Sequence, residues 1–465
     1  MPASRSRDPY RLLPTDAESR SIALDLYERV ADRPIISPHG HVPARLLDDN
    51  LPFRDPADLF VSTDHYVTRL LHASGVPLEL LGVGGQTADP LNAWKALASN
   101  WHIFAGTASG YWLAEELSMF FGVDDDLDDQ NAEQVYHTIA ARLQEPDFLP
   151  RKLFSDFGLE VLATTDDPLD DLSHHARLRR SGLSGRVIPT FRPDAYLDPC
   201  APLFLTKVEK LLAASGSPST FPGYLSALEE RRAYFIEHGA VSTDHGVLEP
   251  LTMDLAPGDA ERIFQAVLTQ TADANEQRQF RAHMLFQMAR MSVFDGLVMT
   301  IHAGVLRNHS SATLERFGPD TGHDIPVHTT FTEGLRPMLE SFGLEKNLHI
   351  VLFTVDETAY SRELAPLAGF YPSVYVGAPW WFLDAPDAIG RYRSAVTETA
   401  GLYRTSGFID DTRAFLSIPA RHDAARRADA AFLARMVREG RMSVRTAGRV
   451  ADDLVDAIPK QVFKL

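Results

Sequence analysis

The chain has 465 residues and a formal net charge of −18 at pH 7, and these totals disfavour several classes of function. A hydrophobic content of 45% and a charged content of 23% are ordinary for a soluble globular protein. The acidic balance disfavours nucleic acid as a partner, because phosphate binding needs a basic face. No apolar stretch approaches the length of a membrane span, so no membrane partner is expected. The single cysteine, Cys200, excludes an internal disulfide and suits a reducing cytoplasm, the location that we predict.

The first expected elements are a helix and a short strand. Thr15 and Glu18 have the spacing of a capping box and precede apolar residues at helical intervals, so a helix should begin near residue 15. The apolar run at residues 34–37 then predicts a strand that leads into His39-Gly40-His41. Side chains alternate along a strand, so the two imidazoles should point to the same side.

The next long stretch, residues 60–157, is expected to be a mostly helical insertion. Its apolar residues have helical spacing, for example at residues 93–97 and 111–117. The stretch is too long for one crossover between neighbouring strands. We therefore expect it to pack over the mouth of the structure that the strands build.

Seven further apolar or β-branched runs each end in a polar cluster, and most are separated by enough chain for a helix. They lie at residues 159–163, 186–190, 240–243, 297–301, 348–355, 374–376 and 406–409. Eight strands with helical crossovers predict an α/β fold, a (β/α)8 TIM-type barrel with its active face at the carboxyl ends of the strands. The predicted division is an N-terminal helix and first strand at residues 1–59, the insertion at 60–157, and the remaining barrel with C-terminal helices at 158–465.

A candidate metal site follows from this topology. In a closed barrel the eighth strand neighbours the first, so Asp411, after the eighth strand, should lie near the histidine pair. His39, His41 and Asp411 would then offer two nitrogen ligands and one oxygen ligand with open positions, which suits one divalent ion, expected to be Zn²⁺. The alternatives are that the histidines are incidental and that Asp411 caps the following helix.

Several short motifs occur in an order and at a spacing that are hard to obtain by chance. They are Asp64-His65-Tyr66, Thr164-Thr165-Asp166-Asp167-Pro168, Phe191-Arg192-Pro193-Asp194, Ser242-Thr243-Asp244-His245, residues 302–308, Trp380-Trp381-Phe382, residues 411–417 and Arg421-His422. By these motifs the chain resembles, nearly end to end, the uronate isomerases (glucuronate isomerases) of the amidohydrolase superfamily. It departs from the family's usual residues at Asn308-His309, Asp356-Glu357 and Ala378-Pro379.

The resemblance implies an aldose–ketose isomerase of hexuronates, which interconverts D-glucuronate with D-fructuronate or D-galacturonate with D-tagaturonate. A proton would leave C2 and return at C1 through an enediol, which needs a base, oxyanion stabilisation and a clamp for the substrate carboxylate. For the clamp we expect Arg192 and Arg413, because guanidinium pairs bidentately with carboxylate. Each could instead form a structural salt bridge, and Arg307 is a weaker candidate.

The proton transfer has three candidate residues: Tyr66, Asp411 and His65. Tyr66 could take the C2 proton if a cation lowered the pKa of its phenol or a proton acceptor paired with it. Asp411 competes as the base, and His65 is either a proton exchanger or a packing residue.

Three more residues complete the expected site. Asp244 should orient a sugar hydroxyl or His302, and His302 should bind the substrate or lie in the outer shell of the metal. Trp380 should form a wall for the sugar, with the adjacent Trp381 in the core if the strand continues.

Two other functions are compatible with the same residues. A metal-dependent hydrolase, such as a lactonase or an amidase, would use His39, His41 and Asp411 to activate water. A non-catalytic sugar-acid binding protein could have the same barrel. The acidic, helix-rich exterior is compatible with a monomer and also with a homo-oligomer.

Overall fold

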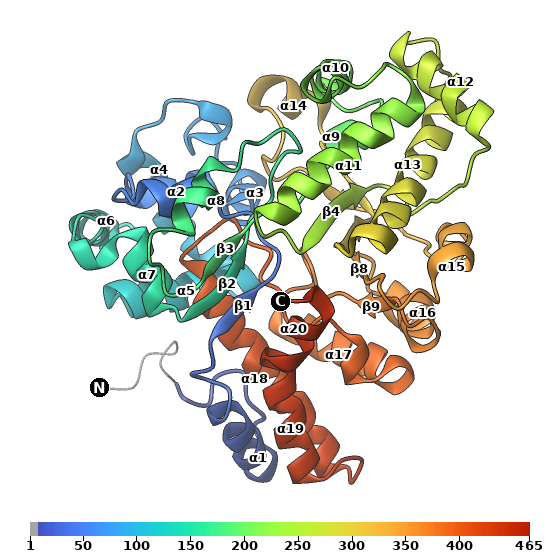
Figure 1. Cartoon of the computed structure of the whole chain (residues 1–465). Coiled ribbons are helices and arrows are strands. Elements are labelled where there is room, and N and C mark those ends of the chain that lie inside the picture. The colour runs from blue at the N-terminus through green and yellow to red at the C-terminus, as the bar shows by residue number, and fades with distance from the viewer. Residues whose placement is uncertain (1–7) are drawn as a thin grey trace.

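Residues 8–465 are described by a computed structural model, in which parallel strands surround a central axis and helices pack outside them (Figure 1). Within these residues the ring is built from β1 (Ile35–Ser37), β2 (Leu159–Ala163), β3 (Arg186–Ile188), β4 (Ser242–Val247), β5 (Val298–Ala303), β8 (Ile350–Thr354) and β9 (Val374–Val376). A small antiparallel hairpin, β6 (Val305–Leu306) and β7 (Ile325–Pro326), lies outside this ring.

The ring is built from two parallel sheets, with the orders β1-β2-β3 and β4-β5-β8-β9. Phe191 links them, because its N–H donates to the Ser242 carbonyl (3.2 Å) and its own carbonyl accepts from the Asp244 N–H (2.9 Å). Strand order therefore follows chain order across the junction. This is what right-handed β/α crossovers produce.

The far ends of the ring meet through the segment that follows β9. Ser406 N donates to the Val376 carbonyl (3.0 Å), and His41 N donates to the Thr412 carbonyl (2.9 Å). The predicted α/β fold with a ring of parallel strands is confirmed, and these bonds join its last segment to its first.

The predicted eighth strand, residues 406–409, is wrong as a strand. One parallel bridge joins Thr405 to β9, and the following residues are irregular. Gly407 has φ +77°, which interrupts an extended backbone, and a Cβ there would lie 2.9 Å from the Leu454 carbonyl. This close approach to a C-terminal helix explains why the eighth segment pairs so briefly.

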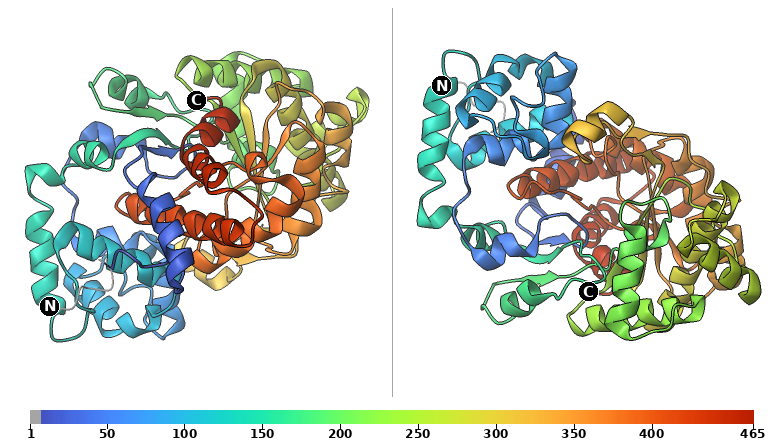
Figure 2. Two further views of the ribbon diagram at one scale, coloured as in Figure 1. Left: turned by 90° about the horizontal axis from the view of Figure 1, so that it is seen from below. Right: turned by 90° about the horizontal axis from the view of Figure 1, so that it is seen from above.

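A helical insertion separates β1 from β2, as predicted. It contains α2 (Ala44–Asp49), η2 (Asp58–Ser62), α3 (His65–Ala73), η3 (Val83–Gly85), α4 (Pro90–Ser99), η4 (Trp101–Phe104), α5 (Ala108–Phe121), α6 (Ala132–Arg142), η5 (Pro146–Phe148) and α7 (Pro150–Asp156). Both views of Figure 2 show these blue and cyan helices on one side of the barrel. The exact division at residues 59 and 157 stays a prediction.

The remaining helices form the outer layer of the barrel. They are α8 (Ser173–Leu178), α9 (Asp194–Leu197), α10 (Phe204–Ser215), α11 (Phe221–Glu237), α12 (Pro257–Leu268), α13 (Ala274–Asp295), α14 (Ser311–Phe317), α15 (Arg336–Phe342), η6 (Tyr360–Leu364), α16 (Ala365–Phe370), α17 (Pro386–Ala400), η7 (Leu402–Arg404), α18 (Ser417–Arg438), α19 (Val444–Val455) and α20 (Ala457–Phe463). The largest apolar core lies between the β4–β9 sheet and its helices, and a second core fills the insertion.

The first helix, α1 (Ala17–Glu28), begins slightly later than the capping-box spacing predicts. Asp16, not Thr15, is its N-cap and accepts a hydrogen bond from Ser19 N at 2.8 Å. An ionised carboxylate is a strong acceptor for the free N–H groups of a first turn, so the cap shifts by one residue.

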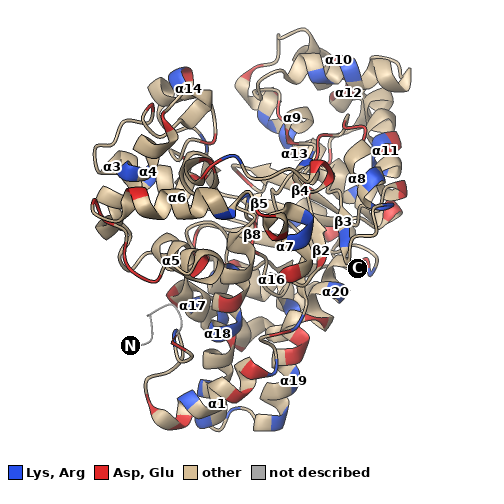
Figure 3. Ribbon diagram, turned by 90° about the vertical axis from the view of Figure 1, so that its left-hand side faces the viewer, with Lys and Arg blue, Asp and Glu red and all other residues tan. Residues whose placement is uncertain are grey.

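Charged side chains are spread over the outer helices. In the view of Figure 3, acidic and basic residues are interspersed over the surface. In the part of the chain that the structure describes, none of the helices combines the length and the apolarity needed to cross a bilayer.

Segment 307–324, which leaves β6 and returns to β7, bridges the barrel and the insertion. Its helix α14 contacts η3, where the backbone of Phe317 lies against Gly84. Gly84 has φ +66°, and a Cβ there would lie 2.2 Å from the Phe317 carbonyl oxygen. Segment 307–324 is therefore positioned by a glycine that allows two backbones to touch.

We expect Gly84→Ala to destabilise the protein more than Gly85→Ala. Gly85 has φ +73° with no atom near its missing Cβ, so both variants incur roughly 1–2 kcal/mol of left-handed strain. Only Gly84→Ala adds the clash with Phe317, an overpacking cost of about 1–3 kcal/mol. Denaturant unfolding measures the difference, and equal losses in the two variants would show that the close approach does not matter.

Candidate active site

The predicted metal-binding residues lie together at the carboxyl ends of the barrel strands. His39 and His41 follow β1, and Asp411 follows the short eighth segment. The His41–Thr412 backbone bond holds these two chain segments side by side. His39 is buried, and Asp411 has φ +40°, a left-handed backbone that turns it out of the line of the preceding segment.

Three imidazoles converge on the Asp411 carboxylate. The Nε2 atoms of His39 and His41 lie 3.3 and 3.0 Å from Asp411 Oδ1, and His302 Nε2 lies 3.9 Å from Oδ2. Possible donor atoms of His39, His302 and Asp411 all lie within 4.8 Å of one another. Nitrogen and carboxylate donors at such distances suit a divalent metal ion.

His302 is the additional donor that sequence reasoning placed only in the outer shell or on the substrate. Its Nδ1 hydrogen-bonds to Asp244 Oδ1 at 2.7 Å, and its Nε2 is buried without a hydrogen-bond partner among residues 8–465. An unpaired buried nitrogen is costly unless a ligand satisfies it. A carboxylate that orients a histidine in this way is typical of the second shell of metal sites. The residues present therefore fit a bound ion.

The electrostatics of the cluster keep its carboxylates charged. Burial alone would raise the pKa of Asp411, but His39 and hydrogen bonds from His39 and His41 outweigh it and hold this pKa well below its usual range. Burial also opposes ionisation of Asp244, whose pKa is nevertheless held well below normal by His302 and Arg192. Burial is the main cause that lowers the pKa of His41.

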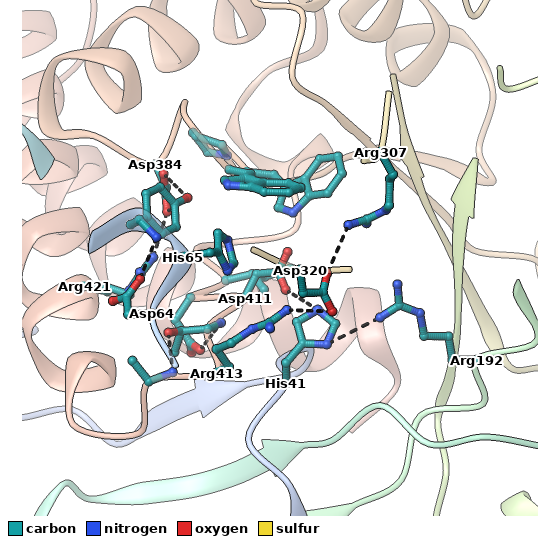
Figure 4. Close-up of a pocket in the computed structure, with 18 residues that line it drawn as sticks. His41, Asp64, His65, Arg192, Arg307, Asp320, Asp384, Asp411, Arg413 and Arg421 are labelled. Atoms are coloured by element: carbon teal, nitrogen blue, oxygen red, sulfur yellow. Dashed lines mark hydrogen bonds and ion pairs between the residues drawn. The ribbon is translucent and has the colours of Figure 1, made fainter. Parts of the chain in front are cut away.

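A cavity opens beside this cluster (Figure 4). Its lining combines barrel-end residues with the start of α3 in the insertion, so the insertion does cover the mouth of the barrel. The lining residues are His41, Asp64, His65, Tyr66, Arg192, Arg307, Asp320, Pro379, Trp380, Trp381, Asp384, Ile409, Asp410, Asp411, Thr412, Arg413, Ala414 and Arg421.

Arg192 lies beside the cluster of imidazoles. Its Nε is 3.1 Å from Asp194 and 3.4 Å from Asp244, and its Nη1 is 3.5 Å from His41 Nδ1. Two carboxylates thus hold this guanidinium at the end of the cavity where the candidate metal ligands lie.

Arg413 and Arg307 lie on either side of Asp320, which belongs to segment 307–324. Arg413 Nη2 is 3.7 Å from Asp320 Oδ2, and Arg307 Nη1 is 4.0 Å from Oδ1 (Figure 4). All three side chains are at least a third exposed, so they form the outer part of the cavity.

Tyr66 is paired with a carboxylate, and no cation of the described residues lowers its pKa below the usual value. Its hydroxyl contacts both oxygens of Asp384 at 3.2 Å, and Asp384 accepts a hydrogen bond from Arg421 at 2.7 Å. Burial and the Asp384 charge raise the pKa of Tyr66 well above 10. The phenol therefore stays protonated at neutral pH and acts as a donor.

His65 and the two tryptophans form an aromatic wall. Burial, with a smaller contribution from Arg413, lowers the pKa of His65 to about 3, so its imidazole is neutral. Trp380 contacts the His302 ring, with centroids 4.8 Å apart. Trp381 is buried in an apolar cluster, as expected, and one side of it also lines the cavity.

The structure brings together the predicted residues and adds two that sequence reasoning missed. All the predicted metal, catalytic and substrate-binding side chains line the cavity or contact a residue that does. Asp320 and Asp384 carry no sequence signal, since both lie in irregular segments with no strand end to predict their direction. Arg421 stands within a recognised motif but had no assigned role.

Comparisons with known proteins agree along the whole chain. The family model described as glucuronate isomerase matches residues 17–463. A uronate isomerase of Corynebacterium efficiens is 50% identical, covering 100% of both chains. A crystal structure of glucuronate isomerase from Caulobacter crescentus has a TM-score of 0.96 at 46% identity, covering 98% of this chain and 96% of that one. A uronate isomerase structure from Thermotoga maritima has a TM-score of 0.93 at 30% identity, with 98% and 99% covered. Together with the residues gathered at the barrel mouth, these similarities show that the chain belongs to the glucuronate isomerase family.

Proposed function

We propose that this protein interconverts an aldohexuronate and a ketohexuronate by moving a proton between C2 and C1. The observation that carries the proposal is the cavity itself, which has candidate metal ligands at its inner end and the guanidinium groups of Arg307 and Arg413 in its outer part. An aldose with a terminal carboxylate presents the complementary pattern, an oxygen-rich C1–C2 end and an anionic C6 end. Family membership supports this reaction over the hydrolase and binding-protein alternatives.

We propose that one divalent ion, Zn²⁺ in the first instance, is held by His39, His41 and Asp411. The Nε2 atoms of His39 and His41 lie 3.3 and 3.0 Å from one oxygen of Asp411. When bound, such an ion supplies Lewis-acid polarisation of substrate oxygens. His302, oriented by Asp244, would point its free Nε2 at the same place and donate to, or accept from, a substrate hydroxyl.

The protonation state of each side chain decides its proposed role in the proton transfer. Asp411 stays ionised, because the histidines hold its pKa low, and is the proposed acceptor of a substrate proton. Tyr66 keeps its proton and would donate a hydrogen bond to a developing oxyanion. His65, neutral with Nδ1 unpaired in the described part of the chain, would accept or donate one hydrogen bond to the sugar.

The substrate carboxylate is assigned to the arginines. Arg413 is loosely paired with Asp320, so its guanidinium can turn to an incoming carboxylate. Arg192 is held tightly by Asp194 and Asp244 near His41, and would meet substrate oxygens closer to the reacting carbons. Trp380 would pack against the carbon chain of the sugar.

A reducing cytoplasm is the proposed location. The one cysteine, Cys200, is an exposed free thiol in the structure, which such a compartment tolerates.

We expect isomerisation in D₂O to place solvent deuterium at C1 of the ketose or C2 of the aldose. NMR of D-glucuronate and D-galacturonate incubated with the enzyme would follow ketose formation and isotope entry. A C2-to-C1 proton shuttle through an enediol exchanges with solvent in at least part of the turnovers. Cleavage products without ketose would support a hydrolase, and binding without turnover would support a binding protein.

We expect His41→Ala to lose most of the bound metal, as His39→Ala does, whereas His302→Ala keeps it. The prediction follows from the shorter distances of the His-x-His pair to Asp411. Metal content per chain after dialysis, measured by atomic spectroscopy, checks it, and activity of His302→Ala should still fall about 10²-fold or more. Loss of metal from His302→Ala with retention in His41→Ala would assign the third ligand to His302 instead.

We expect Tyr66→Phe to lower kcat roughly 10- to 100-fold without changing the shape of the pH profile between pH 6 and 9. A donor that stays protonated over this range contributes no titration of its own, because burial and Asp384 keep the pKa of Tyr66 well above 10. Steady-state kinetics of both proteins across this range test the point. An alkaline rise of kcat that disappears in the variant would instead identify a phenolate base.

A further inference from the structure

A carboxylate stands among the arginines of the outer cavity, where a site built for an anion would not be expected to have one. Asp320 lines the cavity, with Arg413 at 3.7 Å and Arg307 at 4.0 Å from its two oxygens. Figure 4 shows its side chain directed towards both guanidinium groups. Its contacts with them are long for ion pairs, so the carboxylate balances charge without saturating either arginine.

The position of Asp320 is determined by the backbone of segment 307–324. Asp320 has φ +60°, and two residues later Gly322 has φ +92° with its missing Cβ 2.8 Å from the Arg69 Cβ. Asp324 anchors the same segment by accepting from Asn308 N at 2.6 Å. The carboxylate is thus held at the cavity by a segment with close backbone contacts.

Asp320 is ionised at neutral pH. Burial would raise the pKa of Asp320, but the charges of Arg413, Arg307, His65 and Arg192 outweigh burial and lower it. Arg307 is also 3.2 Å from the buried Asp324. The outer cavity therefore contains two arginines and two carboxylates nearby, and Asp320 is the carboxylate that faces the cavity beside the proposed carboxylate site.

We propose that Asp320 is a specificity-determining residue that matches the outer cavity to a C6 group with one negative charge. The inference rests on the proposed function, in which Arg413 meets the substrate carboxylate. A hexose 6-phosphate offers the same C1–C2 chemistry but carries about −1.5 to −2 at its C6 end at pH 7. Asp320 repels that second charge, so the cavity selects a carboxylate over a phosphate ester.

The expected size of the effect follows from Coulomb's law. Removing one of two like unit charges about 5 Å apart near a protein surface changes a dissociation constant by roughly tenfold once solvent screening is included. Loss of the Asp320 charge should lower the dissociation constant of a monoanion by roughly this factor. For a dianion the change in the logarithm of the dissociation constant should be about twice as large. The ratio of the two affinities therefore reports the charge of Asp320, whatever else the variant changes.

Two unreactive ligands test this ratio. L-Gulonate is D-glucuronate with C1 reduced to an alcohol, and sorbitol 6-phosphate is the corresponding reduced form of glucose 6-phosphate. They differ only at C6. Their dissociation constants, measured by calorimetry on the full-length metal-loaded enzyme, give the carboxylate-to-phosphate preference without requiring turnover.

We expect Asp320→Asn to shift this preference towards the phosphate by roughly tenfold. Asparagine keeps the shape of the side chain and tolerates positive φ, so the charge is the main change. Asp320→Gly removes the carboxylate without backbone strain and should give a similar shift. Asp25→Asn, an exposed change of equal charge on α1, should leave the preference unchanged and is the matched control.

An unchanged preference in both Asp320 variants would overturn the proposal. An equal gain in affinity for both ligands would also overturn it, because Asp320 would then hinder both ligands sterically and would not discriminate between them by charge. Isomerase activity of the wild-type enzyme is measured separately. If the wild-type enzyme shows no isomerase activity, the proposed reaction is wrong. The ratio of the two dissociation constants still decides the role of Asp320.

Discussion

The site depends on one backbone contact between His41 and Thr412, which lie at opposite ends of the chain. The hydrogen bond from His41 N to the Thr412 carbonyl joins the loop after β1 to the loop after the eighth segment. It brings Asp411 to within 3.3 Å of two imidazoles. Without closure of the ring, these groups would lie at opposite edges of an open sheet, and no ion could bind both.

Closure is achieved with few hydrogen bonds at two places in the ring. The backbone bridges between the two sheets run through Phe191, and the eighth segment pairs with β9 through the Thr405 bridge. The helical layer compensates, because α18 packs along α1, α5 and α17 and so ties the two ends of the chain together. Buried ion pairs such as Arg393–Asp429, with an Nε–Oδ1 distance of 2.6 Å, fix the register of these helices. A ring with few hydrogen bonds at two junctions can thus hold the site residues in place when its outer helices pack across those junctions.

Charge balance at the cavity is a second constraint. A protein with a net charge of −18 binds an anionic substrate only if cations gather locally. Four arginines line the cavity, yet nearby carboxylates accompany them: Asp194 and Asp244 beside Arg192, Asp384 beside Arg421, and Asp320 beside Arg413. This pairing lowers the cost of burying guanidinium groups and limits the total positive charge. Selectivity then depends on which carboxylate faces the ligand and how firmly it is held.

Local sequence and tertiary contacts determine different features of the fold and the site. Strand runs that end in polar clusters predicted the barrel, because strands and their ends are consequences of local backbone geometry. The His39 and His41 imidazoles converge on Asp411, but β1 ends at Ser37, so ring closure and not strand alternation brings them together. The eighth strand was predicted too long, since the left-handed Gly407 acts through a distant helix that no local pattern reveals. Motif order alone identified the family, and it placed Tyr66, Arg192 and Arg413 at the site. Their charge states were decided only by the fold: burial and Asp384 keep the pKa of Tyr66 high, and Asp320 enters the cavity from an irregular segment. Protonation and selectivity depend on distances between residues remote in the chain, and those distances exist only after the chain has folded.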